Sequence, residues 1–520
     1  MHAKTISKGV VSLGTWSVVK ILASAIASPL LTRILGAEGY GLYASYLAIL
    51  FLASPVANLG TSQSLTKTIA EGPEDVHWRR KTALYILRLN TLGVLLVGGS
   101  VTAVVYWHAP GGASRALLTA TFIGSLVLEQ AFYFSRGILY GLHREELAGI
   151  PAAIGSVISP AVGVALAAYG LGVFGVAAGL LTGDLCVAIL TLTFTIRSLA
   201  AGRTAATTET HPLPTAGIFS FGLTSMLFAV LSMALYRADI ILVRILAHDT
   251  ADAGLYATAV QLSEFVWVIP LAVEGIMLQS TARLWAENRT DRITDILSRL
   301  LRYTALGTSF LLAIVTVFAS DILRLYFGAP FAGADTALLI LIPGVFSFSL
   351  ARVMWPVIQA KGKVLPLVSV VGVATLVNIV LNLLCIPRWG AEGAAIAASI
   401  SYGGVAFAYV WLLRARSVHP LQGLSLIRLA ITFGLAIAAM TLVRLIPIPP
   451  ILALATGCVA ASAAYAIGTL SLGLLSVSEI HQIIETLPAI VKRPALISFE
   501  TIRPLLDRIE RRFVDAPEPR

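Results

Sequence analysis

Charged residues are scarce in this sequence. Asp, Glu, Lys and Arg make up 12% of its 520 residues, about half of the roughly 25% that is usual in soluble domains. Hydrophobic residues make up 57%, and a helix that crosses a bilayer needs about 20 mostly apolar residues. This composition excludes an ordinary soluble enzyme and predicts a protein that crosses a membrane many times.

Cysteine is also rare. Only Cys186, Cys385 and Cys458 occur, and each lies inside an apolar segment. Three scattered cysteines offer neither a disulfide framework nor the C-x-x-C spacing of a zinc or redox site. The sequence therefore predicts no metal site and no cofactor.

Long polar segments and nucleotide-binding motifs are missing as well. Before position 477, the breaks between apolar runs are at most about 20 residues long, so we expect no soluble catalytic domain. The P-loop pattern G-x-x-x-x-G-K-[ST] does not occur, which argues against ATP hydrolysis. A polyprenyl glycosyltransferase or a polysaccharide polymerase would need an acidic outward loop, which is not visible. The sequence therefore predicts a transporter and not an enzyme.

The sequence does contain a long series of apolar runs. Charged or Gly/Pro-rich breaks separate them, and each is long enough for a transmembrane helix. Fourteen such runs occur, at residues 9–31, 41–66, 82–107, 113–139, 148–170, 172–195, 216–241, 252–279, 300–323, 333–359, 363–386, 390–413, 427–446 and 450–476. The expected fold class is an all-α polytopic membrane protein with about 14 transmembrane helices.

Lys and Arg are unevenly divided between these breaks. Twenty lie in the breaks on the side of the N-terminus and six in the others. Because cytoplasmic loops carry the excess of positive residues, this bias predicts that both termini are cytoplasmic. The net charge of +10 is then a topology signal, and we expect no nucleic-acid partner. The first run continues past Lys20 and is expected to be an uncleaved span.

Short strings recur between the two halves of the sequence. LTRIL and GLYA (31–35 and 41–44) return as LVRIL and GLYA at offsets of 211 and 213 residues, and 172–177 resembles 390–395 at an offset of 218. Chance similarity of Gly/Ala-rich sequence is the alternative. Parallel repeats of this kind are typical of alternating-access transporters with a cavity between two lobes.

The repeats suggest a domain organisation with two six-helix lobes related by pseudo-two-fold symmetry plus two extra helices. The last segment, residues 477–520, has an amphipathic pattern and is expected to lie on the cytoplasmic membrane surface. A second amphipathic stretch, at about 283–300, is expected to lie along the same surface. The predicted parts are an N-lobe (1–200), a cytoplasmic linker (201–215), a C-lobe (216–416), two further helices (417–476) and a cytoplasmic tail (477–520).

Three segments of the sequence resemble a known family. They are SKGVVSLGTWSVVK near the N-terminus, LTRILGAEGYGLYA, and YRADIILVRILAHDTADAGLYATA at the start of the second half. These segments resemble the polysaccharide-transporter flippases of the multidrug/oligosaccharidyl-lipid/polysaccharide exporter superfamily. The resemblance implies that a polyprenyl-pyrophosphate-linked oligosaccharide moves from the cytoplasmic to the outer leaflet of a bacterial or archaeal plasma membrane.

The same resemblance bears on partners and alternatives. It implies contact with membrane lipids and with a polysaccharide polymerase or glycosyltransferases, and we expect a monomer. A lipid II flippase would share the fourteen helices, whereas a multidrug or cation exporter would normally have twelve and a more acidic cavity. Both stay open as alternatives.

Ionisable residues inside the spans are the candidate substrate-binding residues, because charges at membrane depth tend to face a wet cavity. Glu129, Tyr133 and Arg136 share one face of the fourth span. Alternatives stay open for several others, namely helix packing for Lys20, snorkelling to the headgroups for Arg88, and shaping of a helix end for Arg237. The predicted cavity residues are Lys20, Arg88, Glu129, Tyr133, Arg136, Arg237 and Arg352.

A coupling ion would need a carboxylate inside the membrane. Glu129, Asp184 and Glu264 are the candidates, since a buried carboxylate can bind a proton near neutral pH. The sequence leaves a proton gradient, a sodium gradient and no coupling equally open. Asn378 and Asn382, one turn apart, are expected to tie helices together.

Overall fold

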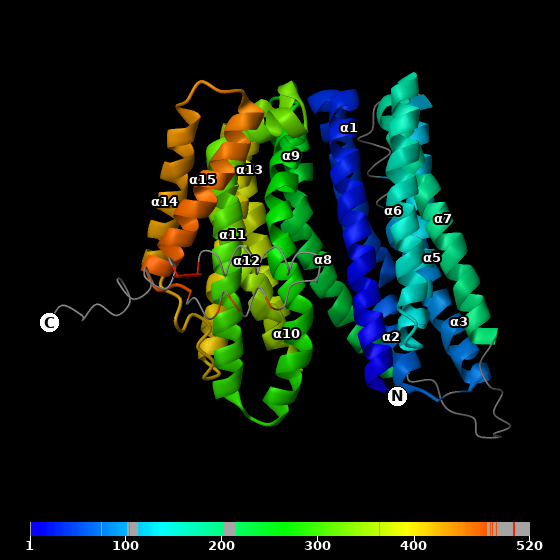
Figure 1. The fold of residues 1–520 in the computed structure, drawn as a ribbon. Helices are drawn as coiled ribbons and strands as arrows, with labels where there is room; N and C mark the ends of the chain where they lie inside the picture. The colour runs from blue at the N-terminus through cyan, green and yellow to red at the C-terminus, as the bar shows by residue number, and fades with distance from the viewer. Residues whose placement is uncertain are drawn as a thin grey trace. The chain divides into compact units, whose positions relative to one another are not determined.

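The structure is a computed structural model of the chain. It describes residues 2–73, 75–100, 103, 113–200, 215–362, 364–475, 479, 481, 485, 503 and 504. Every regular element in these residues is helical (Figure 1). Hydrocarbon offers no hydrogen-bond partners to the backbone, whereas a helix pairs its backbone N–H and C=O groups with one another. The predicted all-α class is therefore confirmed. The linker 201–215, save its last residue, and most of the tail 477–520 lie outside the described residues.

The elements follow the apolar runs closely. In chain order they are α1 (His2–Asn58), α2 (Thr61–Glu71), α3 (Val76–Gly93), η1 (Val94–Gly98), α5 (Ala113–Gly141), α6 (Glu146–Leu166), η2 (Ala167–Leu171), α7 (Gly172–Ala200), α8 (Thr215–Leu246), α9 (Asp252–Glu264), η3 (Phe265–Trp267), α10 (Val268–Ala286), α11 (Thr290–Tyr326), η4 (Ala329–Ala334), α12 (Asp335–Ala360), α13 (Leu365–Arg414), α14 (Leu426–Arg444) and α15 (Pro450–Ser471).

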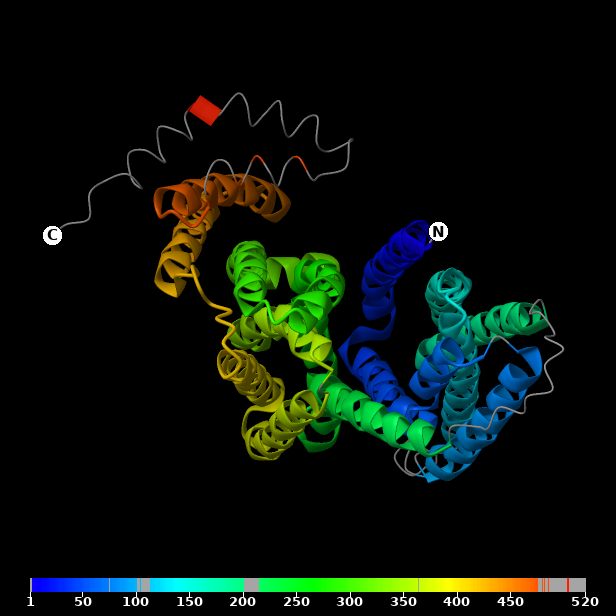
Figure 2. The same cartoon turned by 90° about the horizontal axis from the view of Figure 1, so that it is seen from below.

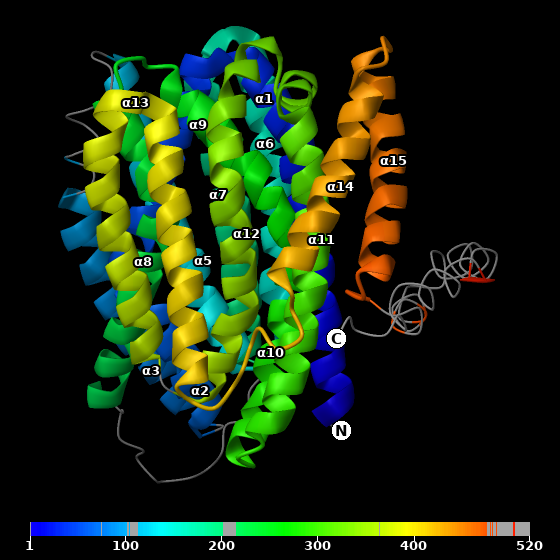
Figure 3. The same cartoon turned by 90° about the vertical axis from the view of Figure 1, so that its left-hand side faces the viewer.

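Eleven helical stretches among the described residues are long and apolar enough to cross a membrane, which makes this a multi-pass membrane protein. Three of them contain glycines with non-helical backbone angles, at Gly36, Gly170 and Gly390. At Gly390 the chain reverses direction within α13 (yellow in Figure 3). If each of the three stretches is counted twice, eleven becomes fourteen, but the count of fourteen stays a prediction.

One compact unit comprises residues 1–258, 323–337 and 368–398. In it, α6 packs against α7, α7 against α5, and α1 against both α6 and α8; α5 to α7 are cyan to blue-green in Figure 2. One buried cluster joins Leu50 of α1, Phe122 of α5 and Ala177 of α7. These contacts bring α1, α2, α5 and α8 together, and the candidate site lies among them.

The other unit comprises residues 259–322, 338–367 and 399–520. Its α14 and α15 pack side by side (orange in Figure 3). Arg444 of α14 forms an ion pair with Asp321 of α11, at 3.1 Å, and also donates to the Val317 carbonyl, next to a kink in α11 at Phe318. The two extra helices are thus anchored to α11.

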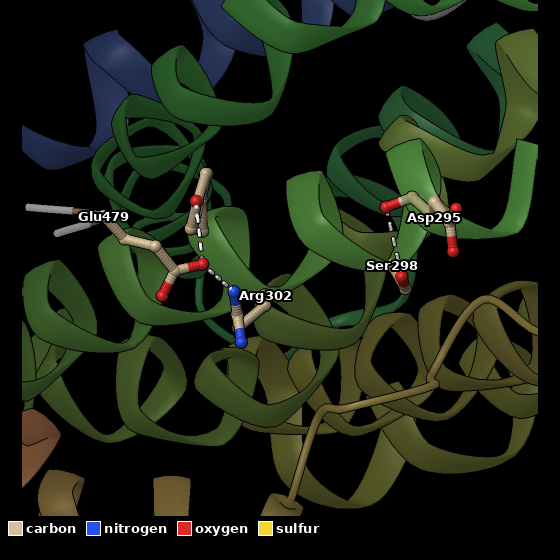
Figure 4. Close-up of polar contacts among 5 residues, drawn as sticks. Asp295, Ser298, Arg302 and Glu479 are labelled. Carbon is tan, nitrogen blue, oxygen red and sulfur yellow. Dashed lines mark hydrogen bonds and ion pairs between the residues drawn. The ribbon is translucent and has the colours of Figure 1, made fainter. Parts of the chain in front are cut away.

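Polar contacts also connect the first half of α11 to the chain that follows α15. Arg302 forms an ion pair with Glu479, and the Tyr303 hydroxyl donates to the same carboxylate at 3.2 Å (Figure 4). The Ser298 hydroxyl donates to the Asp295 carbonyl at 3.3 Å. Glu479 therefore ties the start of the tail to α11.

The stretch at about 283–300, which the sequence predicts to lie along the membrane surface, forms no separate helix. These residues form the end of α10, a short turn around Asn288 and the first turns of α11. The amphipathic pattern arises because the ends of two spanning helices present charged residues to water. The predicted lobe boundaries stay a prediction, because the two units group residues by contact and cut across them.

Candidate functional site

A cavity of about 370 Å³ lies in the first unit. Four helices form its wall: the second half of α1, the start of α2, the second half of α5 and the middle of α8. Its lining residues are Phe51, Ser54, Pro55, Asn58, Ser62, Gln63, Tyr133, Arg136, Ala229, Met233, Tyr236 and Arg237. The wall thus combines two guanidinium groups, aromatic rings and neutral hydrogen-bonding groups.

Arg136 and Arg237 supply the positive charge of the cavity. The Arg136 guanidinium lies 4.8 Å from the ring centroid of Tyr133 and 5.7 Å from that of Tyr140. Arg237 lies 6.0 Å from the ring centroid of Phe51. Cation–π contacts of this kind hold a guanidinium in place without neutralising it. Both guanidinium groups thus lie beside aromatic rings at the cavity wall.

Three further predicted residues lie near this cavity. Lys20 is exposed on α1, and its charge interacts with that of Arg136. Glu129 interacts with Ser54 of the cavity wall and with Asp184 of α7. Within the described part of the chain, Oε2 of Glu129 and Oδ2 of Asp184 are buried without a hydrogen-bond partner. The structure thus brings together the two carboxylates that we single out as coupling candidates in the first half of the sequence.

A buried amide network supports the cavity wall. The Gln130 Nε2 group donates to the Ser54 carbonyl at 3.0 Å. The Asn58 and Asn90 amides both donate to Gln130 Oε1, at 2.9 and 3.3 Å. Buried polar groups must be paired to be tolerated, so this network fixes the relative positions of α1, α3 and α5. The sequence does not predict this network, because no pattern in it shows which amides on different helices pair with one another.

A second buried network explains the conspicuous Asp239 beside Arg237. Tyr256 of α9 donates to Asp239 at 2.8 Å, and Asn382 of α13 donates to it at 2.7 Å. Asn382 also donates to Asn378, at 3.0 Å. The expectation that these asparagines tie helices together is confirmed. Asp239 joins α8, α9 and α13, whereas its neighbour Arg237 lines the cavity.

Arg88 lies apart from the other candidates. It is exposed on α3, on the face that also carries Leu84 and Leu92, which are 58% and 57% exposed. It is not among the residues that line the cavity. This position is the one expected for an arginine that reaches the lipid headgroups through an apolar surface.

Arg352 and Glu264 belong to the second unit. Arg352 forms an ion pair with Glu274 of α10 at 2.9 Å, and its guanidinium lies 5.5 Å from the ring centroid of Trp267. Trp267 packs in turn against Phe348 and Tyr402. The sequence does not predict Glu274 as the partner of Arg352, because the two residues are 78 positions apart along the chain. Arg352 is thus a paired cation beside an aromatic cluster.

Comparison with known proteins identifies the family. The model of a family described as polysaccharide biosynthesis protein matches residues 6–271, just over half of the chain. No curated protein matches the sequence. The structure of the lipid II flippase MurJ, in an inward closed conformation, is similar over 88% of this chain and 98% of its own, with a TM-score of 0.70 and 14% identity.

Two transporter structures have the same fold at lower similarity. An inward-facing multidrug resistance MATE family transporter of the MOP superfamily matches 78% of this chain and 96% of its own, with a TM-score of 0.60 and 15% identity. A MOP superfamily transporter from Pyrococcus furiosus matches 79% and 95%, with a TM-score of 0.56 and 15% identity. The chain therefore belongs to the polysaccharide biosynthesis protein family and has the all-helical fold of MOP superfamily transporters.

Proposed function

We propose that this protein is a flippase that moves a polyprenyl-pyrophosphate-linked oligosaccharide from the cytoplasmic to the outer leaflet by alternating access. Its product would serve the assembly of a cell-surface polysaccharide. The observation that carries the proposal is the cavity in the first unit, in which Arg136 and Arg237 face a space of about 370 Å³. Membership of a polysaccharide biosynthesis family supports the choice of substrate.

The chemistry of the cavity suits a pyrophosphate. An unpaired anion moved into an apolar environment loses several kcal/mol or more of solvation, so a flippase must replace the lost water with cations. A guanidinium can bind a phosphate through two parallel hydrogen bonds. Arg136 and Arg237 lie on α5 and α8 and would bind it from two sides, with Lys20 close to Arg136.

The remaining lining residues suit a sugar. Tyr133, Tyr236 and Phe51 offer aromatic faces, and Gln63 offers an amide. Sugar rings have apolar C–H faces and hydroxyl edges, which such a mixture of rings and amides can contact. The prenyl tail needs no protein site, because it is already soluble in lipid. The protein need only shield the polar head.

Membrane potential or ion coupling would drive the movement. We place the protein in the plasma membrane with both termini in the cytoplasm. Moving two negative charges outward across an inside-negative membrane gains roughly 4.6 kcal/mol per 100 mV, at about 2.3 kcal/mol per charge. If an ion is coupled, Glu129 and Asp184 are its carriers, because they interact with each other and Glu129 lies beside the cavity wall.

Reconstitution of the purified protein tests the proposal. Vesicles would carry a fluorescent polyprenyl-pyrophosphate-linked oligosaccharide in the inner leaflet, and an impermeant glycosidase would report its arrival outside. Parallel vesicles would carry lipid II, and others would contain a fluorescent organic cation. We expect the oligosaccharide to appear outside at a rate that depends on Arg136.

Each of the other outcomes would indicate a different function. Movement of lipid II alone would make this a lipid II flippase, which is the function named for MurJ. Export of the cation alone would make it a multidrug exporter. Either result would overturn the proposal for the oligosaccharide.

A further inference from the structure

Two pairs of glycines bring α1 into backbone contact with elements of the second repeat. The first pair is Gly41 of α1 and Gly254 of α9. A Cβ added to Gly41 would lie 2.7 Å from the Gly254 amide nitrogen, and one added to Gly254 would overlap the Ala37 carbonyl oxygen. Gly41 and Gly254 begin the two copies of the GLYA string. The repeated motif therefore contacts its own copy.

Other contacts reinforce this end of the first unit. The Thr32 hydroxyl donates to the Phe327 carbonyl at 2.9 Å, and Arg33 donates to the Leu325 carbonyl at 2.7 Å. Tyr40 packs edge-on against Phe331, with ring centroids 6.0 Å apart. We call this set of contacts the Gly41 contact.

The second glycine pair is Gly60 and Gly222. Gly60 lies between α1 and α2 with φ 68°, and a Cβ added to it would overlap the Gly222 carbonyl of α8. A Cβ added to Gly222 would lie 2.8 Å from the Ser64 hydroxyl. Beside them, the Lys67 ammonium lies 4.9 Å from the ring centroid of Phe221. We call this set the Gly60 contact.

The cavity lies between these two contacts along both helices. On α1, its lining residues occupy positions 51–58, after Gly41 and before Gly60. On α8, they occupy positions 229–237, after Gly222 and before the turn that leads to Gly254. The Gly41 contact therefore lies beyond one end of the cavity lining on α1. The Gly60 contact lies at the other end, beside Ser62 and Gln63 of α2, which also line the cavity.

We propose that the Gly41 and Gly60 contacts are the two gates of the cavity, of which one opens while the other stays closed. The proposal rests on the flippase function, since a gate matters only if a substrate enters and leaves. Both contacts are formed in this structure. The orientation predicted from the charges places the Gly41 gate outside and the Gly60 gate inside.

Glycine is suited to such a gate for a steric reason. Without side chains, two helices approach until their backbones touch, and they part without disturbing interlocked rotamers. Larger side chains would hold the ends apart or force the closed state to shift. A valine at either glycine should therefore open one gate and leave the other unaffected.

Thiol accessibility tests the gates without any substrate. Cys186, Cys385 and Cys458 would be replaced by alanine, and Met233→Cys would place one reporter in the cavity wall. An impermeant maleimide would be added to intact cells or to inside-out vesicles. We expect Gly222→Val to speed labelling about tenfold from the inside only, and Gly254→Val about tenfold from the outside only.

A matched control and two exposed substitutions complete the test. Gly404→Val changes a glycine with no atom within 4 Å of an added Cβ and should leave both rates unchanged. If the glycine variants do not insert, Lys67→Ala and Arg33→Ala remove one exposed contact from each gate. They should raise labelling about threefold, from the inside and the outside respectively.

The proposal would be overturned by unchanged labelling in all four gate variants, or by variants of both gates acting from the same side. Its failure is distinguishable from failure of the proposed function. Vesicles could still move the oligosaccharide while the gates proved to lie elsewhere, and the gates could still open as expected in a protein that moves another substrate.

Discussion

Gly172 and Gly390 adopt the same backbone conformation. Their φ/ψ angles are 51°/−130° and 50°/−128°, a combination that favours glycine because a Cβ would crowd the backbone. They lie 218 residues apart, at the register of the repeat in the sequence. Gly172 is the first residue of α7, and Gly390 lies in α13 where the chain reverses direction. The two copies of this segment therefore fold in the same way, which supports the repeat against chance similarity.

Alanine should be tolerated differently at these two positions. At Gly172 an added Cβ meets no atom within 4 Å, whereas at Gly390 it would overlap the carboxylate of Asp252. We expect Gly172→Ala to lower the free energy of unfolding by about 1–3 kcal/mol through backbone strain alone. Gly390→Ala should cost more. Thermal unfolding of the purified protein in detergent measures both.

The Asp252 carboxylate provides the control for that comparison. Asp252→Ala removes the overlap, so the double variant with Gly390→Ala should lose no more stability than Gly172→Ala and Asp252→Ala added together. Equal costs for Gly172→Ala and Gly390→Ala in the presence of Asp252 would contradict this explanation.

Much of the fold follows from the sequence because a membrane restricts the choice to helices. Runs such as 113–139 and 427–446 correspond to α5 and α14 within a few residues at each end. The runs 363–386 and 390–413 predict a break next to Gly390, where the structure has a turn. The amphipathic pattern at 283–300 belongs to the ends of two spanning helices, and such a pattern alone does not distinguish them from a surface helix.

The candidate site was only partly predictable. Tyr133 and Arg136 share the cavity wall because they lie three residues apart on one helix, and spacing along a helix is visible in a sequence. The pairing of Arg352 with Glu274, 78 residues away, is not. Packing of α3 against its neighbours decides whether the face with Arg88 is buried or exposed. The sequence pattern alone does not show this packing.

The contrast between Arg136 and Arg88 yields a matched prediction. Arg136→Ala removes a cation from the cavity wall and should reduce oligosaccharide transport at least about tenfold, because one charge-assisted contact contributes roughly 1.5–3 kcal/mol. Arg88→Ala changes an exposed arginine outside the cavity and should leave transport within about twofold. Initial transport rates in vesicles, at equal protein, provide the measurement.

Membrane insertion of both variants must be confirmed for the comparison to hold. Equal loss of transport in both would show that Arg88 acts on the substrate despite its position. Wild-type transport in both would remove the basis for a cationic cavity.

Arg352 and Glu274 should behave as a structural pair. Each side chain is only about one-fifth exposed, so removing one partner leaves the other charge poorly solvated. We expect Arg352→Ala and Glu274→Ala each to destabilise the protein, and the double variant to lose at least about 1 kcal/mol less than their sum. Thermal unfolding of the four proteins gives this coupling energy. Additive losses, with transport abolished only by Arg352→Ala, would instead assign Arg352 to substrate binding.

Glu129 decides whether a proton is coupled to transport. Glu129→Gln keeps the shape of the side chain but cannot exchange a proton. If Glu129 carries one, transport by the variant should lose its response to a pH gradient while transport driven by membrane potential continues. Rates with and without an imposed gradient separate the two driving forces. A response identical to that of the wild type would leave Glu129 with a structural role beside Ser54 and Asp184.

The leaflet distribution of lipid-linked glycan in living cells tests the central claim most directly. A membrane-impermeant reagent that modifies sugars would be applied to cells with and without this protein, and to cells that carry Arg136→Ala. We predict that unmodified lipid-linked oligosaccharide accumulates on the cytoplasmic face when the protein is absent and when Arg136 is replaced. An unchanged distribution in both, together with a new sensitivity to cationic drugs, would contradict the flippase function and indicate an exporter.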